Sequence, residues 1–251
     1  IAYRPGPVKC GDNDRRRNVV RGILYGIGVG PGDPELMTLK AVRLIRESDV
    51  CAVPGEHVEK TTAYRIAVQA VPELKDKELL PVYMPMVMDR KLQQRCHKEG
   101  AEKIEACLLQ GKNVAFLTLG DPTVYSTYLY IHKRIDAAGY NTEIISGITS
   151  FCAVSAKLNT GLVEKAEPLH VIPASYQIDE ALKLPGTKVL MKAGKKMAHV
   201  KEVLKGMGDC EAMMIENCGM PDEKIYRSAD EINENAGYYS LIIVKEKNKA
   251  D

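Results

Sequence analysis

Short apolar segments alternate with helical segments along most of this 251-residue chain, and this alternation strongly restricts the fold. The predicted strands are 23–29, 50–53, 78–82, 113–119, 142–145, 169–172, 187–191, 211–215 and 238–244. The predicted helices are 34–46, 61–70, 90–110, 127–138, 149–158, 177–182 and 196–206. Strands separated by helices favour an α/β fold with a largely parallel sheet.

The alternation begins again near the middle of the chain, which predicts two α/β lobes. We expect a flexible N-terminal extension at 1–21, an N-terminal α/β domain at 22–139 and a C-terminal α/β domain at 140–251. The extension has no hydrophobic period, and it is either flexible or an arm that reaches a partner or the ligand. In such folds the ligand lies beyond the carboxyl ends of strands or between domains.

The charged residues and the cysteines restrict the class of protein. The net charge is +2, from 35 Lys and Arg against 33 Asp and Glu, which argues against a dedicated nucleic-acid-binding protein. Seven cysteines form no C-x-x-C pair, which favours reduced thiols in the cytoplasm over a disulfide framework or a zinc site. No apolar run reaches about 18 residues. We therefore expect a cytoplasmic protein with no nucleic-acid, membrane or metal-ion partner.

Two glycine turns follow apolar strands, in YGIGVGPGDP and in FLTLGDPTVY. Gly26, Gly28 and Gly30 do not match the G-x-G-x-x-G spacing of a dinucleotide site, and no acidic residue is well placed for a ribose. A P-loop is excluded because Gly-Lys-Ser/Thr is absent. The residues alone leave two interpretations open. The glycines either permit a tight strand-to-helix turn, or they form backbone-lined corners of a ligand site.

Taken together, these segments resemble the tetrapyrrole methylases, the S-adenosylmethionine (SAM)-dependent methyltransferases of cobalamin and sirohaem biosynthesis. The resemblance covers about residues 22–247 and is carried by LYGIGVGPGDPELMTLKAVRLIRESDVCAVP, FLTLGDPTVYSTYLYIHKRI and EPLHVIPA. Within the family, the sequence is most similar to the precorrin-2 / cobalt-factor-II C(20)-methyltransferases. The resemblance implies two α/β lobes with a ligand trough between them, and a homodimer.

The implied reaction transfers a methyl group from SAM to carbon 20 of precorrin-2 or cobalt-factor II and releases S-adenosylhomocysteine (SAH). The alternatives are another tetrapyrrole methylase, such as a uroporphyrinogen or other precorrin methyltransferase, or a diphthine-synthase-like protein methyltransferase. A tetrapyrrole- or SAM-binding regulator without turnover is an alternative from another class. The sulfonium donor is already activated, so alignment and exclusion of water supply much of the rate. Any cobalt belongs to the substrate.

The resemblance also assigns residues to the site. For SAM it implies Leu119, Gly120, Asp121, Val124, Thr149, Ser150, Met191 and Cys218. For the substrate it implies Pro31, Gly32, Asp33 and Tyr128. The expected catalytic residues are Asp121 and Tyr125, and two questions stay open. Asp121 either orients its loop or only caps the next helix, and the two tyrosines either line the macrocycle or belong to the core.

Overall fold

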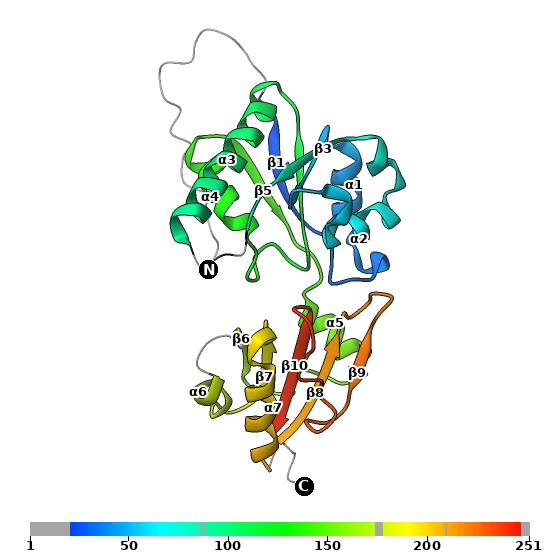
Figure 1. The fold of residues 1–251 in the computed structure, drawn as a ribbon. Helices are drawn as coiled ribbons and strands as arrows, with labels where there is room; N and C mark the ends of the chain where they lie inside the picture. Colours follow the sequence, from blue (N-terminus) through cyan, green and yellow to red (C-terminus); the bar gives the residue numbers. More distant parts are fainter. Residues whose placement is uncertain (1–20, 86, 88, 174–177, 209, 247–251) are drawn as a thin grey trace.

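The chain folds into two lobes that lie one above the other in Figure 1, each built on a five-stranded sheet. The computed structural model describes residues 21–246 except 86, 88, 174–177 and 209. The predicted N-terminal extension therefore lies, up to residue 20, outside the described residues. The fold class expected from the sequence, two α/β lobes, is confirmed.

The first lobe contains a parallel sheet in the order β3-β2-β4-β1-β5. Its strands are β1 (Ile23–Gly28), β2 (Val50–Pro54), β3 (Glu78–Val82), β4 (Val114–Thr118) and β5 (Asn141–Ile145). One face carries α1 (Leu39–Glu47) and α2 (Thr62–Ala70), and the other carries α3 (Arg90–Leu109) and α4 (Tyr128–Ala137). Because the strands are parallel, their carboxyl ends share one edge, which faces the second lobe (Figure 1).

The central strand β4 explains why an apolar run in the sequence predicted a buried strand. All five of its residues are buried, as expected for a strand covered by helices on both faces. Phe116 packs toward α3 and α4, whereas Leu117 packs toward α1 and α2. Successive side chains of one strand thus supply both cores of the lobe.

The second lobe contains a mixed sheet in the order β6-β7-β10-β8-β9. Its strands are β6 (Leu169–Pro173), β7 (Thr187–Met191), β8 (Cys210–Glu216), β9 (Lys224–Tyr226) and β10 (Ser240–Glu246). β6 and β7 are parallel, whereas β10 is antiparallel to β7 and β8, and β9 is antiparallel to β8. One face carries α6 (Ile178–Leu182) and α7 (Met197–Gly206), and the other carries α5 (Ser150–Lys157).

One prediction about this organisation is wrong. The strand at 142–145 does not open the second lobe, because β5 pairs with β1 and completes the first sheet. The first lobe therefore ends after Ile145 instead of at residue 139, and the change of sheet falls between β5 and β6. The expected parallel sheet is confirmed in the first lobe, and the second lobe adds a mixed sheet in which β9 and β10 run antiparallel to β8.

The predicted helix at 34–46 is divided. Residues Pro34–Leu36 form a separate 3-10 turn, and Asp33 caps that turn by accepting a hydrogen bond from the Glu35 N–H at 2.9 Å. The α-helix begins only after Thr38, whose hydroxyl accepts from the Ala41 N–H at 3.2 Å. Two capping side chains close together in the sequence thus produce two short elements.

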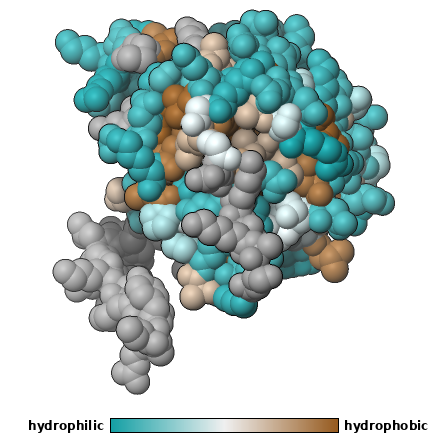
Figure 2. Space-filling model, turned by 90° about the horizontal axis from the view of Figure 1, so that it is seen from below, coloured by the Kyte–Doolittle hydropathy of each residue, from teal (hydrophilic) through white to brown (hydrophobic). Residues whose placement is uncertain are grey.

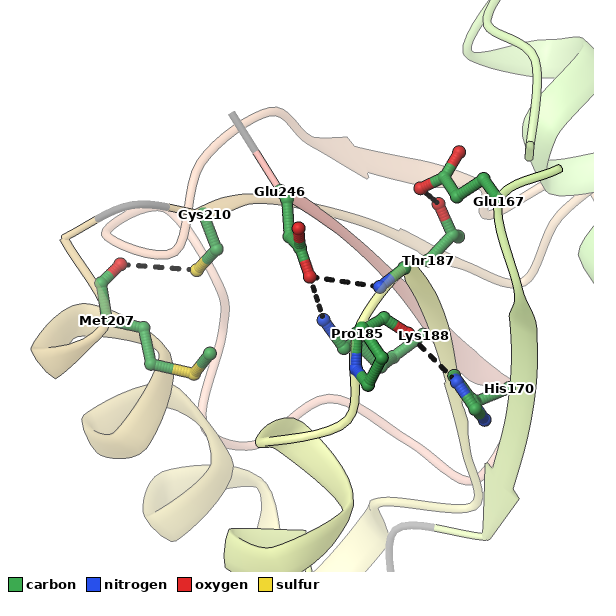
Figure 3. A network of polar contacts seen from close by, with 9 residues as sticks. Glu167, His170, Pro185, Thr187, Lys188, Met207, Cys210 and Glu246 are labelled. Atoms are coloured by element: carbon green, nitrogen blue, oxygen red, sulfur yellow. Dashed lines mark hydrogen bonds and ion pairs between the residues drawn. The ribbon is translucent and has the colours of Figure 1, made fainter. Parts of the chain in front are cut away.

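A polar network holds strand ends of the second sheet together, away from the cavity described below (Figure 3). The side chain of Lys188 in β7 is only 3% exposed, and its Nζ lies 3.4 Å from Oε1 of Glu246. The same oxygen accepts a hydrogen bond from the Gly186 N–H at 2.9 Å. These partners lower the pKa of Glu246, the Gly186 N–H most and Lys188 next. The buried ammonium is therefore paired with a carboxylate.

The surface is mostly hydrophilic on the face that Figure 2 shows. Seen from below, hydrophobic residues form smaller patches that hydrophilic ones interrupt. Across the described part of the chain, no helix combines the length and the apolar character that crossing a bilayer requires.

Candidate active site

A cavity of about 430 Å³ lies between the carboxyl edge of the first sheet and the second lobe. Residues from both lobes line it, as the strand-end rule predicts. The structure brings ten of the predicted site residues together here: Pro31, Leu119, Gly120, Asp121, Val124, Tyr125, Thr149, Ser150, Met191 and Cys218.

The two glycine turns are joined directly by backbone hydrogen bonds beside the cavity. The Gly120 N–H donates to the Gly30 carbonyl at 2.8 Å, and the Gly30 N–H donates to the Gly120 carbonyl at 3.3 Å. Both residues have positive φ, +77° at Gly30 and +70° at Gly120, which glycine adopts without a Cβ penalty. The turns after β1 and β4 therefore form one backbone unit beside the cavity.

A third glycine packs against this unit. A Cβ placed on Gly147, in the loop after β5, would lie 2.2 Å from the Gly120 carbonyl oxygen. A Cβ on Gly28 would lie 2.5 Å from the same oxygen. Backbone thus packs on backbone where β1, β4 and β5 end, and no side chain fits between the three segments.

Asp121 connects two of these loops. Its Oδ1 accepts hydrogen bonds from the N–H and Oγ1 of Thr123 at 2.7 and 2.5 Å, and its Oδ2 accepts from the Gly147 N–H at 3.0 Å. The residue is only 7% exposed. It does not cap α4, whose N-cap is Thr127. Of the two interpretations left open by the sequence, the geometry favours orientation of the loop.

Tyr125 extends from the loop after β4 to the second lobe. Its hydroxyl donates to the Val171 carbonyl in β6 at 3.0 Å. Its own carbonyl accepts a hydrogen bond from Nζ of Lys192 at 3.1 Å. Tyr125 has a positive φ of +49°, which is uncommon for a residue other than glycine. The side chain thus bridges the two lobes at the cavity and does not belong to the core.

Comparison with known proteins identifies the family. The model for the Tetrapyrrole (Corrin/Porphyrin) Methylases matches residues 23–232. The chain belongs to the tetrapyrrole methylases. It is accordingly a methyltransferase, and its methyl donor is SAM.

Two curated relatives and one solved structure are similar over nearly their full length. A probable cobalt-precorrin-2 C(20)-methyltransferase of Methanocaldococcus jannaschii is 34% identical over 88% of this chain and 95% of the relative. A precorrin-2 C(20)-methyltransferase of a Sinorhizobium species is 30% identical over 89% and 95%. The fold matches that of a uroporphyrin-III C-methyltransferase of Thermus thermophilus, solved with SAH, with a TM-score of 0.63 and 21% identity. The match covers 90% of this chain and 98% of the solved chain.

Thr149 places a buried hydroxyl without a hydrogen-bond partner at the cavity of this tetrapyrrole methylase. It occupies the N-cap position of α5, but its side chain makes no capping hydrogen bond. Among the described residues, its Oγ1 is the buried side-chain N or O atom that has no hydrogen-bond partner. An orphaned buried hydroxyl costs about 1–3 kcal/mol. Because it lines the cavity, a polar atom of a bound ligand is the natural partner.

The remaining walls suit the apolar parts of SAM. Met191, Ile215 and Leu241 line the cavity from the second sheet. Cys218 also lines it, and burial raises the pKa of its thiol to about 11. The thiol is therefore neutral at physiological pH and forms part of the wall. The residues present fit SAM, which the Thr149 hydroxyl and the backbone of Leu119–Asp121 would contact.

Three predicted substrate residues, Tyr128, Gly32 and Asp33, do not line the cavity. Tyr128 is fully buried between the first sheet and α3, its hydroxyl lies 3.1 Å from Nδ1 of His132, and burial raises its pKa. Gly32 packs on the second lobe, where an added Cβ would lie 2.2 Å from the Cys218 carbonyl oxygen. Asp33 caps the 3-10 turn after the first glycine loop. Of the first turn's predicted residues, Pro31 alone lines the cavity.

Several lining residues were not predicted: Lys60, Thr61, Thr62, Ser126, Met220, Tyr238 and Tyr239. The first three follow β2, whose carboxyl end lies at the same edge as those of β1 and β4, so the strand-end rule could have found them. Tyr238 and Tyr239 precede β10, and no signal in the sequence places the start of that strand at the cavity. Across the described residues, no three His, Cys, Asp or Glu side chains gather as a metal site requires.

Proposed function

We propose that this protein transfers the methyl group of SAM to carbon 20 of precorrin-2 or of its cobalt complex, in cobalamin biosynthesis. The observation that carries the proposal is the identity of 34% and 30% to two C(20)-methyltransferases over nearly the whole length of each. The cavity supports it, because its walls combine backbone, apolar side chains and one free buried hydroxyl. Such a site aligns and desolvates an activated donor without a protein nucleophile.

We assign a different role to each of three residues of the site. Asp121 holds the loop of Leu119 and Gly120 against Gly147, so that the backbone facing the donor is rigid before binding. Methylation of a ring carbon releases a proton to water, and Tyr125 is the candidate to orient the ring that loses it. Its hydroxyl donates to Val171, which leaves an oxygen lone pair free to accept. Pro31 borders the substrate side of the cavity in this proposal.

Turnover of defined substrates tests the proposal. The protein is incubated with SAM and either precorrin-2 or cobalt-factor II, and SAH release is followed together with the position of the new methyl group by NMR. We expect equimolar SAH and a product methylated at carbon 20. Methylation at another carbon or of another tetrapyrrole would favour a different tetrapyrrole methylase. SAH binding without turnover would favour a regulator. The ratio of the turnover rates with precorrin-2 and with cobalt-factor II shows whether the preferred substrate is metal-free or contains cobalt.

The protein also acts as a homodimer in the cytoplasm in this proposal. The support is the resemblance to the family, whose members are usually homodimers. Light scattering on the purified chain, at about 55 kDa for two copies of 27.7 kDa, would agree with it. A mass of one chain at micromolar concentration would contradict it.

A further inference from the structure

Lys192 is a cation of the cavity without an assigned role. It directly follows Met191 at the end of β7 and lines the cavity beside it. The charged side chains that line the cavity are Lys60, Asp121 and Lys192. Both oxygens of Asp121 accept hydrogen bonds from the surrounding loops. The side chains of the cavity therefore carry a positive excess, and its one carboxylate is already engaged.

Neutral groups alone hold the ammonium of Lys192. Its Nζ donates to the Tyr125 carbonyl at 3.1 Å. It also lies 5.5 Å from the ring centroid of Tyr125 and 6.0 Å from that of Tyr238, within the range of cation–π attraction. Among the described residues, no carboxylate oxygen pairs with this ammonium. Two of its three N–H donors are therefore left for other acceptors.

The backbone at this contact is in a costly conformation. Lys192 has a φ of +58° and Tyr125 a φ of +49°, although neither is glycine. Such conformations are strained, and they persist where the surroundings determine them. Here the two strained residues contact each other across the lobes and both line the cavity. The hydrogen bond to the Tyr125 carbonyl and the contacts with the two rings place the ammonium at the cavity before a ligand arrives.

We propose that Lys192 binds a carboxylate of a ligand in this cavity. A preorganised ammonium with free donors and no counter-ion is the complement of a carboxylate, and a charge-assisted hydrogen bond is stronger than a neutral one. The inference rests on the proposed function, which supplies two sources of this group. One is the methionine carboxylate of SAM, and the other is the acidic side chains of the tetrapyrrole.

The test compares Lys192→Met, which keeps the length of the side chain and removes its charge, with Lys192→Arg, which keeps the charge. Lys183→Met is the matched control, because Lys183 lies in the same lobe, pairs with Glu180 at the surface and does not line the cavity. Calorimetry measures the Kd of SAH, and steady-state kinetics measure the KM of precorrin-2. Thermal unfolding confirms that each variant is folded.

We expect Lys192→Met to weaken one of the two ligands about 10- to 100-fold, as loss of a hydrogen bond to a charged group does. Lys192→Arg should recover most of the loss, and the loss should shrink at high salt. A weaker Kd of SAH assigns the carboxylate to the donor, and a higher KM of precorrin-2 assigns it to the tetrapyrrole. Changes below about twofold in both ligands, or equal effects of Met and Arg, would overturn the proposal.

The two proposals fail in different ways. If wild-type protein binds SAH but does not methylate precorrin-2, the proposed function is wrong, and the Kd of SAH still tests whether Lys192 binds the donor's carboxylate. If wild-type protein methylates carbon 20 and Lys192→Met does so with unchanged Kd and KM, the role of Lys192 is wrong and the proposed function stands.

Discussion

The carboxylate of Asp121 accepts a hydrogen bond from the backbone N–H of Gly147 at 3.0 Å, and this contact joins the loops that follow β4 and β5. Gly147 in turn packs directly on the Gly120 carbonyl. The segment Leu119–Asp121, which faces the cavity, is thus held by one side chain and one bare backbone position. The Gly147 position and the Asp121 side chain can each be changed by a single substitution, so their contributions can be measured separately.

Gly147→Ala should destabilise the protein and weaken SAH binding. The new Cβ would meet the Gly120 carbonyl at 2.2 Å, so the backbone of one loop must move. Overpacking of this kind costs about 1–3 kcal/mol. Chemical denaturation measures the free energy of unfolding, and calorimetry measures the Kd of SAH.

The matched control is Gly206→Ala in α7, where an added Cβ meets no atom of the described residues within 4 Å outside its own helix. It should be neutral or stabilising by up to about 1 kcal/mol, because alanine favours a helix over glycine. Equal effects of the two variants would show that the contact between Gly147 and Gly120 is not tight.

Asp121→Asn should lower stability by about 1–3 kcal/mol and weaken SAH binding. An asparagine has one acceptor oxygen for three donors, so a donor is left without its partner or faces the amide NH₂. Asp33→Asn is the control within the same Gly-Asp-Pro motif, since Asp33 accepts a single hydrogen bond outside the cavity. Asp33→Asn should lower the free energy of unfolding by less than Asp121→Asn does, and it should leave the Kd of SAH unchanged. If Asp121→Asn abolishes kcat while the Kd of SAH is unchanged, Asp121 is catalytic and not a positioning residue.

Asp33 and Asp121 also show which features of the site cannot be predicted from the sequence. Both stand in Gly-Asp-Pro after a parallel strand, and the sequence could predict the strands and the turns, because an apolar run such as 113–119 is typical of a strand buried on both faces. The sequence could not predict which aspartate joins two loops. That depends on Gly147, which β5 brings opposite Asp121 only because β5 pairs with β1 in the first sheet.

Tyr125 and Tyr128 illustrate the same limit at shorter range. They lie one helical turn apart, and either could line a cavity or fill a core. α4 begins at Tyr128, which points into the core, while Tyr125 lies in the preceding loop. The sequence predicts a helix here but not which of the two tyrosine side chains faces the core. The positive φ of Lys192 had no sequence signal either, since a lysine rarely adopts it.

Tyr128→Phe should therefore change stability and not substrate binding. The ring keeps its contact with Phe116, at 5.2 Å between centroids, and only the hydrogen bond to His132 is lost. We expect a loss of about 1 kcal/mol in the free energy of unfolding. Tyr125→Phe, which removes the hydroxyl that bonds Val171 across the lobes, should instead raise the KM of precorrin-2. A raised KM with Tyr128→Phe would return Tyr128 to the substrate site.

Stability should fall as the pH rises above 9, because buried thiols keep their protons in the folded state. Cys51 in β2 is fully buried, and burial raises the pKa of its thiol from 9.0 to about 12. Between pH 9 and 12 the unfolded chain releases this proton while the folded chain retains it. The folded state then binds more protons than the unfolded state, so the free energy of unfolding decreases with pH. At pH 10 the loss amounts to about 1 kcal/mol for this thiol.

Cys51→Ala isolates this contribution. Urea denaturation under reducing conditions at pH 8 and pH 10 measures the difference in the free energy of unfolding, which should be about 1 kcal/mol smaller in the variant than in the wild type. The cavity that alanine leaves lowers stability equally at both pH values, so the difference is free of it. Cys152→Ala is the control for loss of a thiol, because the Cys152 side chain is exposed. An unchanged difference in Cys51→Ala would show that this thiol titrates alike in the folded and unfolded chain.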